Sequence, residues 1–313
     1  MGKSNLTLMQ KADLALADLQ NGGHLNPEQT DRFIRKILSE PTILRASRAV
    51  GMSAPQRKIN KIGFGSRILH AGKSSVALTQ AQRSKPDLGQ IELNTKEVIA
   101  EVRIPYDVLE DNIEGGNINA QAGDSAGGMM GTIVELIAER VAVDLEELAL
   151  LGDKASSDPF LALTDGWLKT ADENIVQIAS GEIIKMDNAL ALTNAIPSKY
   201  LRQRNTFKFF ADPTTDFNLR KEVQSRSTAL GDNFLVNYNE FPIMGSQVQM
   251  AGNLPLNNMF YTNPFNLLFG IQRQITLEYD KDITKREFII VVTARVDFQI
   301  EEKEAVSKIV IGD

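Results

Sequence analysis

The fold is decided by one stretch of the chain, residues 124–152, which reads DSAGGMMGTIVELIAERVAVDLEELALLG. Asp124 or Ser125 can cap the start of a helix here, and Gly152 can end it. At 1.5 Å per residue, about 26 residues make a rod roughly 40 Å long, whereas the mean helix has about 11–12 residues. Its apolar side chains recur at the spacing of one wide helical face: Met130, Ile133, Val134, Ile137, Val141, Leu145 and Leu148. We predict that this helix is the spine of the molecule.

The opposite face of the helix is charged. Glu135 and Glu139 lie four residues apart on it, and Arg140 and Asp144 form an i,i+4 pair. Two such carboxylates could contribute to a di-metal site, but that site needs a Glu-x-x-His partner on another helix, and the C-terminal half of the chain has no histidine. We interpret this face as solvated, or as one that forms ion pairs with a neighbouring subunit.

Strands and short helices surround the spine. Glu97–Tyr106 alternates apolar and charged residues and predicts a strand, and a short acidic helix is expected over Val108–Glu114. Helices are expected over Ile183–Leu192 and from Asp212 to about Gln224. Further strands are expected at Thr206–Phe210, Phe241–Met244, Val248–Met250, Met259–Tyr261 and Leu267–Ile271, then at Gln274–Tyr279 paired through a turn at 280–284 with Phe288–Ile300, while 302–311 fits a helix or a strand. This order is neither alternating βα nor all-β, so the fold class is α+β.

Residues 59–95 lack helical periodicity and contain few large apolar side chains. Short β-type segments such as Lys61–Leu69 and Ser75–Thr79 are separated by glycines and a proline. Such a stretch cannot bury a core of its own, and an isolated two-stranded ribbon is marginally stable. We predict a long exposed two-stranded excursion that lies on a neighbouring subunit.

The first sixty residues are basic, although the whole chain carries a net charge of −6. Two helices are expected there, over Leu6–Leu19 and from about Pro27 to before Pro41. Their basic residues indicate either a solvated helix face or a contact surface: Arg32, Arg35, Lys36, Arg45 and Arg48.

Composition excludes several classes of protein. The 313 residues suffice for one large or two medium domains, and the mild acidity argues against a strongly basic nucleic-acid-binding protein. The absence of cysteine removes disulfides and thiol chemistry, and the two histidines, His24 and His70, disfavour an enzyme. No apolar run reaches the length of about 18 residues that a membrane span needs, and Met1–Gln10 does not resemble a signal peptide, so we expect a soluble cytoplasmic product.

Motifs for chemistry are incomplete. Ala71–Ser74 ends like a phosphate-binding loop, but Arg67 stands where the motif requires glycine. Gly63-Phe64-Gly65 lacks the third glycine of a dinucleotide-binding motif, and no Gly-x-Ser-x-Gly elbow occurs. Trp167, the single tryptophan, is interpreted as a core anchor. We therefore expect no catalytic residue, no cofactor and no metal.

In order and spacing, these segments resemble the major capsid proteins of tailed bacteriophages, whose fold is shared with encapsulins and the floor of herpesvirus capsids. The resemblance rests on the strand and acidic helix at 98–114 and on the spine helix that ends at Leu148–Asp153. It continues through Asp165–Leu168, which resembles the family's Pro-Gly-Ile/Leu turn without the proline. Pro242–Val248 and the strand Arg295–Asp297, followed by Ala305, complete it.

The resemblance implies four parts: an N-terminal arm (1–58), an extended loop (59–96), a peripheral domain with the spine helix (97–204 and 272–313) and an axial domain (205–271). It implies a structural protein that self-assembles into pentamers and hexamers of an icosahedral shell around double-stranded DNA, located in the virion and assembled in the bacterial cytoplasm. Scaffolding, portal and decoration proteins are implied partners, and the basic arm could face DNA or a scaffold. Interface candidates on the loop and the spine are Arg67, Lys73, Lys85, Glu135, Glu139 and Arg140.

Some members of this family cross-link the extended loop through a Lys–Asn isopeptide bond, and Lys73 and Lys85 lie in the matching region. Two alternatives stay open at this stage. One is an encapsulin-type nanocompartment shell, which has the same fold, and the other is a soluble enzyme with a carboxylate or lysine site between domains.

Overall fold

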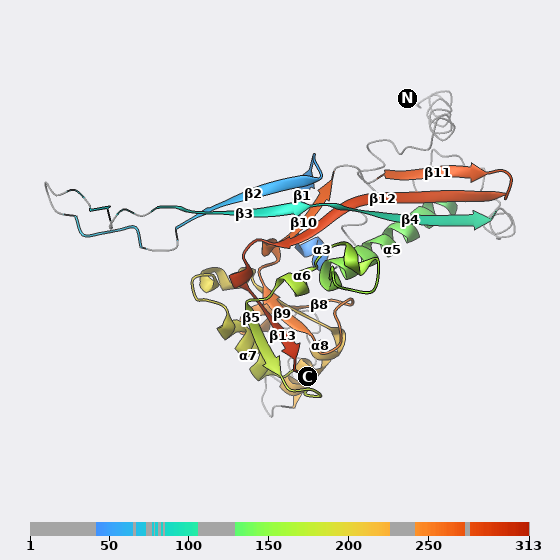
Figure 1. Cartoon of the computed structure of the whole chain (residues 1–313). Coiled ribbons are helices and arrows are strands. Elements are labelled where there is room, and N and C mark those ends of the chain that lie inside the picture. The colour runs from blue at the N-terminus through green and yellow to red at the C-terminus, as the bar shows by residue number, and fades with distance from the viewer. Residues whose placement is uncertain are drawn as a thin grey trace, which may run out of the picture.

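A computed structural model describes residues 42–64, 67–72, 77, 79–80, 83, 85–105, 129–225, 242–272 and 276–312. The molecule has an elongated upper body and a lobe below its middle (Figure 1). A thin two-stranded ribbon leaves one end of the body, and a sheet and the long helix extend to the other end. The predicted helices in the first 41 residues and at Val108–Glu114 lie outside the described residues.

A five-stranded sheet forms the upper body around β12 (Glu287–Ile300). The first half of β12 lies between β11 (Thr276–Asp282) and β4 (Lys96–Pro105), both antiparallel to it. Its second half pairs with β10 (Leu267–Gln272), which in turn pairs in parallel with β1 (Arg48–Met52). The predicted hairpin at 274–300 is confirmed, with its turn displaced to 283–286, where Arg286 takes a positive φ of 55°.

The long helix is present as α5 (Met129–Leu151), and the predicted capping residues before it lie outside the described part of the chain. Ile137, Leu145 and Leu148 on its apolar face share a hydrophobic core with Val292 and Val296 of β12. The alternation predicted for β4 is also confirmed, because Val98, Ala100, Val102 and Ile104 pack against this core while their neighbours are exposed.

A six-stranded sheet forms the lobe, in the order β5 (Asn174–Ile178), β13 (Val306–Ile311), β9 (Met259–Thr262), β6 (Lys208–Ala211), β8 (Ser246–Met250) and β7 (Pro242–Ile243). Successive residues of a strand face opposite sides, so Phe209 joins a lobe core while Phe210 joins the core of the upper body. The sheet therefore separates the two cores. The helices α7 (Met186–Ala195) and α8 (Pro213–Gln224) pack against its lobe side.

Short elements connect these parts: α3 (Thr42–Ala46), α6 (Trp167–Thr170) and the 3₁₀ turns η3 (Leu161–Leu163), η4 (Leu201–Thr206), η5 (Pro264–Asn266) and η6 (Lys303–Ala305). The start of α8 follows the prediction, because the Asp212 carboxylate accepts hydrogen bonds from the backbone N–H groups of Thr214 and Thr215 at 3.0 and 3.2 Å. The segment 302–311, left open between helix and strand, is a 3₁₀ turn followed by β13.

The ribbon is built from β2 (Gln56–Gly63) and β3 (Asp87–Asn94), which pair antiparallel over their whole length. The predicted positions of the strands in this ribbon were wrong. Among the described residues of the segments expected to be β-type, 61–63 lie in a strand, whereas those at 67–69, 77 and 79 are irregular. Outside the ribbon, the helix expected from Ile183 begins instead at Met186. The elements α3, β1 and β5 were not predicted.

Candidate assembly site at the ribbon base

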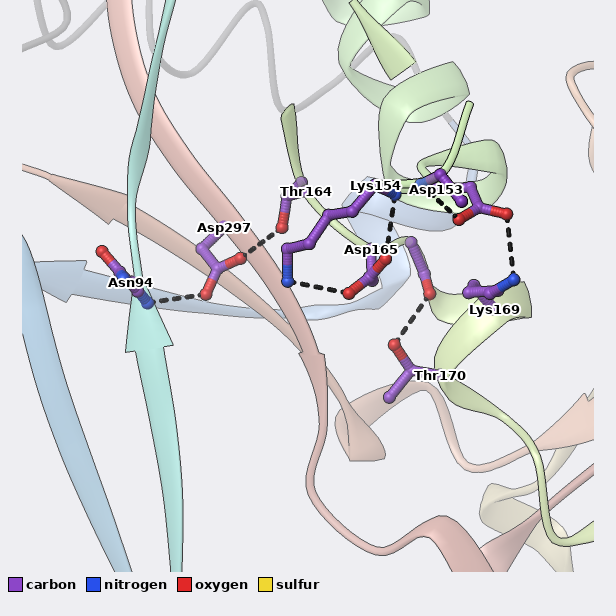
Figure 2. Close-up of polar contacts among 10 residues, drawn as sticks. Asn94, Asp153, Lys154, Thr164, Asp165, Lys169, Thr170 and Asp297 are labelled. Carbon is purple, nitrogen blue, oxygen red and sulfur yellow. Dashed lines mark hydrogen bonds and ion pairs between the residues drawn. The ribbon is translucent and has the colours of Figure 1, made fainter. Parts of the chain in front are cut away.

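Asp297 joins the ribbon to the body. Its side chain is only 3% exposed, in the second half of β12. One carboxylate oxygen accepts a hydrogen bond from the backbone N–H of Asn94, at 2.7 Å, and the other accepts one from the Thr164 hydroxyl, also at 2.7 Å (Figure 2). A single carboxylate therefore connects β12, the end of β3 and the loop after η3.

Burial raises the pKa of the Asp297 carboxyl, because desolvation disfavours its charged form. The hydrogen bonds from Thr164 and Asn94 and the charge of Lys154 act in the opposite direction without cancelling the effect. A buried carboxylate is costly unless its oxygens are hydrogen-bonded, and both oxygens of Asp297 are.

The loop at 152–170 brings Thr164 to this position through two ion pairs. The Lys154 ammonium lies 2.7 Å from Asp165, and the Lys169 ammonium lies 2.9 Å from Asp153 (Figure 2). Partial burial of Asp165 acts to raise its pKa, but the hydrogen bonds from Lys154 prevail and hold it below the ordinary value. The Thr170 hydroxyl at the end of α6 donates to the carbonyl of Gly166, the residue before the helix, at 2.9 Å.

Two glycines let this loop lie against the end of α5. The Gly166 N–H donates to the Gly152 carbonyl at 2.8 Å. A Cβ on Gly152 would lie 2.4 Å from the Thr164 carbonyl oxygen, and one on Gly166 would lie 2.8 Å from that of Ala149. Side chains at these positions would displace backbone, so the joint requires glycine at both.

Trp167 is confirmed as a core anchor. It is 1% exposed, its indole N–H donates to the Leu268 carbonyl at 3.3 Å, and its ring meets Phe298 edge-on with centroids 5.6 Å apart. Phe298 in turn stacks on Phe269. The loop, β10 and β12 are thereby held together next to Asp297.

One face of the ribbon rests on the body at its base. Leu93 is fully buried in a small cluster with Val50, Met52 and Leu268, against which Ile59 and Ile91 also pack. Further out the ribbon is exposed and apolar. Ile62 and Leu88 lie opposite each other with exposures of 71% and 75%, and Phe64, Ile68 and Leu69 are also exposed. Exposed apolar residues gathered in one place indicate an interaction surface.

The outer face of the β11–β12–β4 sheet is acidic. Residues paired directly across an antiparallel sheet point to the same side, and on the side of Ile99, which is 70% exposed, the registers place six carboxylates and two arginines. These residues are Glu97, Glu101, Glu278, Asp280, Asp282 and Glu287, with Arg103 and Arg295. Arg103 and Arg295 form ion pairs with Glu101 at 2.6 Å and Glu97 at 3.0 Å.

The residues predicted as contact sites lie apart from one another. Arg67 and Lys85 are exposed on the ribbon segment, and Glu139 and Arg140 are exposed on α5, where Arg140 pairs with Asp144 at 2.8 Å. Arg45 and Arg48 are exposed at α3 and β1, and Arg48 pairs with Glu301 at 3.1 Å. Lys73, Arg32, Arg35 and Lys36 and the side chain of Glu135 lie outside the described residues.

Sequence reasoning assigned no role in a site to Asp297, Thr164 or Asn94. The only signal was a carboxylate within the apolar strand at 288–300. Asp297 lies on the face opposite to Val296 and Phe298, so alternation alone would expose it.

No group of three or more His, Cys, Asp or Glu residues in the described part of the chain is arranged to hold a metal ion. Among the helices that the structure describes, none is long and apolar enough to cross a membrane.

This arrangement of spine helix, ribbon and two sheets is the fold of phage major capsid proteins. The structure is similar over its whole length to a chain of the satellite phage P4 procapsid that includes the size determination (Sid) protein (TM-score 0.67, 14% identity, 100% of this chain and 99% of the other). It is also similar to the capsid of a native GTA particle (TM-score 0.61, 16% identity, 88% and 91% covered) and to a virus-like particle from Pyrococcus furiosus (TM-score 0.53, 11% identity, 90% and 96% covered).

Sequence similarity leads to a narrower assignment. No protein-family model matches the chain. The chain is 41% identical over 318 residues to YqbE of Bacillus subtilis (strain 168), named as a prophage capsid protein, with 98% of each chain covered. It therefore belongs to the family of prophage capsid proteins, as a structural major capsid protein of the virion. The alternatives of an encapsulin-type shell and a soluble enzyme are not favoured.

Proposed function

We propose that this chain assembles with copies of itself into the pentamers and hexamers of an icosahedral shell that encloses double-stranded DNA, built in the cytoplasm of the host bacterium. The exposed apolar ribbon is the observation that carries this proposal, because the paired Ile62 and Leu88 are 71% and 75% exposed in the single subunit. The assembled capsids among the structural neighbours support self-association. The role is structural and involves no catalysis.

The ribbon of one copy contacts the outer sheet face of the next. In one subunit the ribbon and the β11–β12–β4 sheet extend toward opposite ends of the body (Figure 1), so the two surfaces meet only between copies. Such a head-to-tail contact generates closed rings when the rotation between copies closes, as pentamers and hexamers require.

Charge supports this pairing. Residues 56–94 carry seven Lys and Arg against two Asp and Glu, a net charge of +5. The outer sheet face carries six carboxylates against two arginines, a net charge of −4. Opposite charges favour the correct register of two partners, and the exposed Ile99 offers an apolar surface to the ribbon.

We propose the four-part division with three adjustments: 59–96 as the extended loop, 97–204 and 272–313 as the peripheral domain and 205–271 as the axial domain are the starting ranges. We move the last strand of the axial range, β10, to the peripheral domain because it pairs with β12. We move β5, α7 and β13 to the axial domain because they belong to the lobe, where β13 pairs with β5 and β9. Residues 42–52 of the arm belong with the body, since Ile43 and Leu44 are buried in its core.

Other partners follow from charge and from the family. The basic residues of the arm would face either a scaffolding protein or double-stranded DNA, which they would contact without sequence specificity. These residues are Arg32, Arg35, Lys36, Arg45 and Arg48. Portal and decoration proteins are further expected partners, and Lys73 and Lys85 are candidates for covalent cross-linking of the loop.

Electron microscopy of particles formed by the full chain in cells that also carry its phage assembly genes tests the proposal. We expect closed shells with the wild type and unassembled subunits with the double variant Ile62→Asp, Leu88→Asp. A matched control is Ile175→Asp, which places the same charge on a residue of β5 that is 43% exposed. Normal shells from the ribbon variant, or no shells from the wild type, would contradict the proposal.

A further inference from the structure

Beside the apolar contacts of Leu93, Ile59 and Ile91 at its base, the ribbon is held to the body by two polar contacts along its length. At the inner anchor the Asn94 N–H donates to the buried carboxylate of Asp297 at 2.7 Å. At the outer anchor the Lys61 ammonium lies 3.0 Å from a carboxylate oxygen of Glu302. Lys61 and its partner Gly89 lie five residues from Gln56 and Asn94 in the ribbon register, so at 3.3 Å per residue the anchors are about 17 Å apart.

The two anchors differ in character. Asp297 is 3% exposed and both of its oxygens are hydrogen-bonded, so salt screens this contact little. The side chains of Lys61 and Glu302 are 25% and 43% exposed, and salt screens an ion pair of that kind. We therefore expect the outer anchor to open more readily than the inner anchor.

Glu302 is a fixed point for the outer anchor. Asn266 clamps its backbone on both sides, because the Glu302 N–H donates to the Asn266 side-chain oxygen at 2.7 Å and the Glu302 carbonyl accepts from the Asn266 amide at 2.9 Å. Its second carboxylate oxygen lies 3.5 Å from the Tyr200 hydroxyl, at the edge of the lobe. Glu302 thus connects the ribbon to the segment that joins the two sheets.

The outer anchor is well placed to set the direction in which the ribbon points. Ile62 and Leu88 lie one residue further out and are largely exposed, so the part of the ribbon offered to another copy begins just past Lys61. Without the outer anchor, the ribbon would be held by the Asn94 bond and by the apolar contacts of Leu93, Ile59 and Ile91, all within three residues of Asn94 in the register. The part of the ribbon beyond Ile91 could then swing about this base.

We infer that Glu302 is the positioning residue of the ribbon: its ion pair with Lys61 sets the direction in which the ribbon leaves the subunit, and opening of this pair lets the ribbon swing about the inner anchor at Asp297. The consequence for assembly rests on the proposed function, since direction matters only if another copy receives the ribbon. The anchor itself is a property of the single subunit.

The absence of cysteine makes the test direct. Spin labels are attached to two introduced cysteines, Leu88→Cys in the ribbon and Ile175→Cys in the lobe. Double electron–electron resonance then measures the distance between the labels in the full, unassembled chain. We expect Lys61→Met and Glu302→Gln each to shift or broaden the distance distribution by several Å. The unmodified pair should show the same change in 1 M NaCl, where the screening length is about 3 Å.

Two further variants separate this role from general loosening. Arg48→Met removes a comparably exposed ion pair, 3.1 Å from Glu301, that involves β1 and not the ribbon, and should leave the distribution unchanged. The charge exchange Lys61→Glu with Glu302→Lys should restore it. An unchanged distribution in Lys61→Met, or an equal change in Arg48→Met, would overturn the inference. Failure of the wild type to form shells would count against the proposed function alone, because the distances are measured in single subunits.

Discussion

The buried carboxylate of Asp297 accepts a hydrogen bond from the backbone N–H of Asn94 at 2.7 Å, so the last residue of the ribbon is joined to the central strand of the body. The contact uses a main-chain donor, and no substitution at position 94 other than proline removes it. The Thr164 hydroxyl completes the joint from the loop after the spine helix.

Asp297→Ala should destabilise the subunit, because it leaves the buried Thr164 hydroxyl and the partly buried Asn94 N–H without their acceptor. At about 1–3 kcal/mol for an unsatisfied buried group and less for a partly solvated one, we expect a loss of about 1–4 kcal/mol in the free energy of unfolding. Asp297→Asn should cost less, since its oxygen and amide can serve Asn94 and a rotated Thr164 hydroxyl. Urea unfolding measures both. The control is Asp172→Ala, which removes an exposed ion pair with Lys303 and should change stability by less than about 1 kcal/mol; equal losses at the two positions would contradict the role of Asp297.

Stability should depend on pH through Asp297. Its pKa in the folded subunit is raised above the ordinary 3.8 by burial, so between the two values the folded state holds the proton that the unfolded state has released. The contribution of this group is therefore fully favourable below 3.8 and is lost as the pH rises through the folded-state pKa. Unfolding of the wild type and Asp297→Asn over this range should show the wild type losing stability relative to the variant as pH increases. If the free energies of unfolding of the two proteins changed equally with pH, the pKa of Asp297 would be the same in the folded and unfolded states.

Gly152→Ala and Gly166→Ala should each destabilise the subunit by at least about 1–3 kcal/mol, the usual cost of overpacking a core. In both cases the added methyl meets backbone atoms at less than 3 Å, and backbone yields less readily than a side chain. Thermal unfolding compares them with Gly51→Ala, where a Cβ meets nothing within 4 Å. A control variant as unstable as the other two would refute the explanation by close approach.

Ile99→Lys should weaken assembly without weakening the subunit. The residue is 70% exposed on the acidic outer sheet face, so the folded monomer tolerates a lysine there, while the basic ribbon of the next copy loses an apolar contact and meets a like charge. Sedimentation velocity and electron microscopy measure assembly, and urea unfolding checks the subunit. Phe265→Lys, at a residue of η5 that is 65% exposed, is the matched control. Full assembly of Ile99→Lys would place the ribbon contact elsewhere.

Local pattern was sufficient for the regular elements. The periodicity of residues 130–148 predicted the spine helix, alternation predicted β4 and β12, and Asp212-Pro213 predicted the start of α8. Each signal lies within one element, where side chains three, four or two residues apart share a face. The low apolar content of 59–95 also predicted an exposed ribbon. Its two strands, at 56–63 and 87–94, lie mostly outside the segments predicted to be β-type.

The joint could not be predicted in this way. Its contacts join residues that are far apart in the chain. Strand β1 pairs with β10, with Arg48 opposite Leu268, and both Asn94 and Thr164 donate hydrogen bonds to Asp297. Alternation placed Asp297 on the side away from the core, and it is buried only because β3 and the loop after η3 cover it. The Lys61–Glu302 pair likewise joins two residues that looked like ordinary surface charges.

By itself the sequence determined which segments are helix, strand or exposed ribbon, because those choices follow from the spacing of apolar side chains along the chain. Only the tertiary structure decided that the ribbon is held at Asp297 and Glu302 and that one sheet face is left acidic and open. Those features depend on which distant segments pair, and burial of a polar group is set by the neighbours that arrive from elsewhere in the chain.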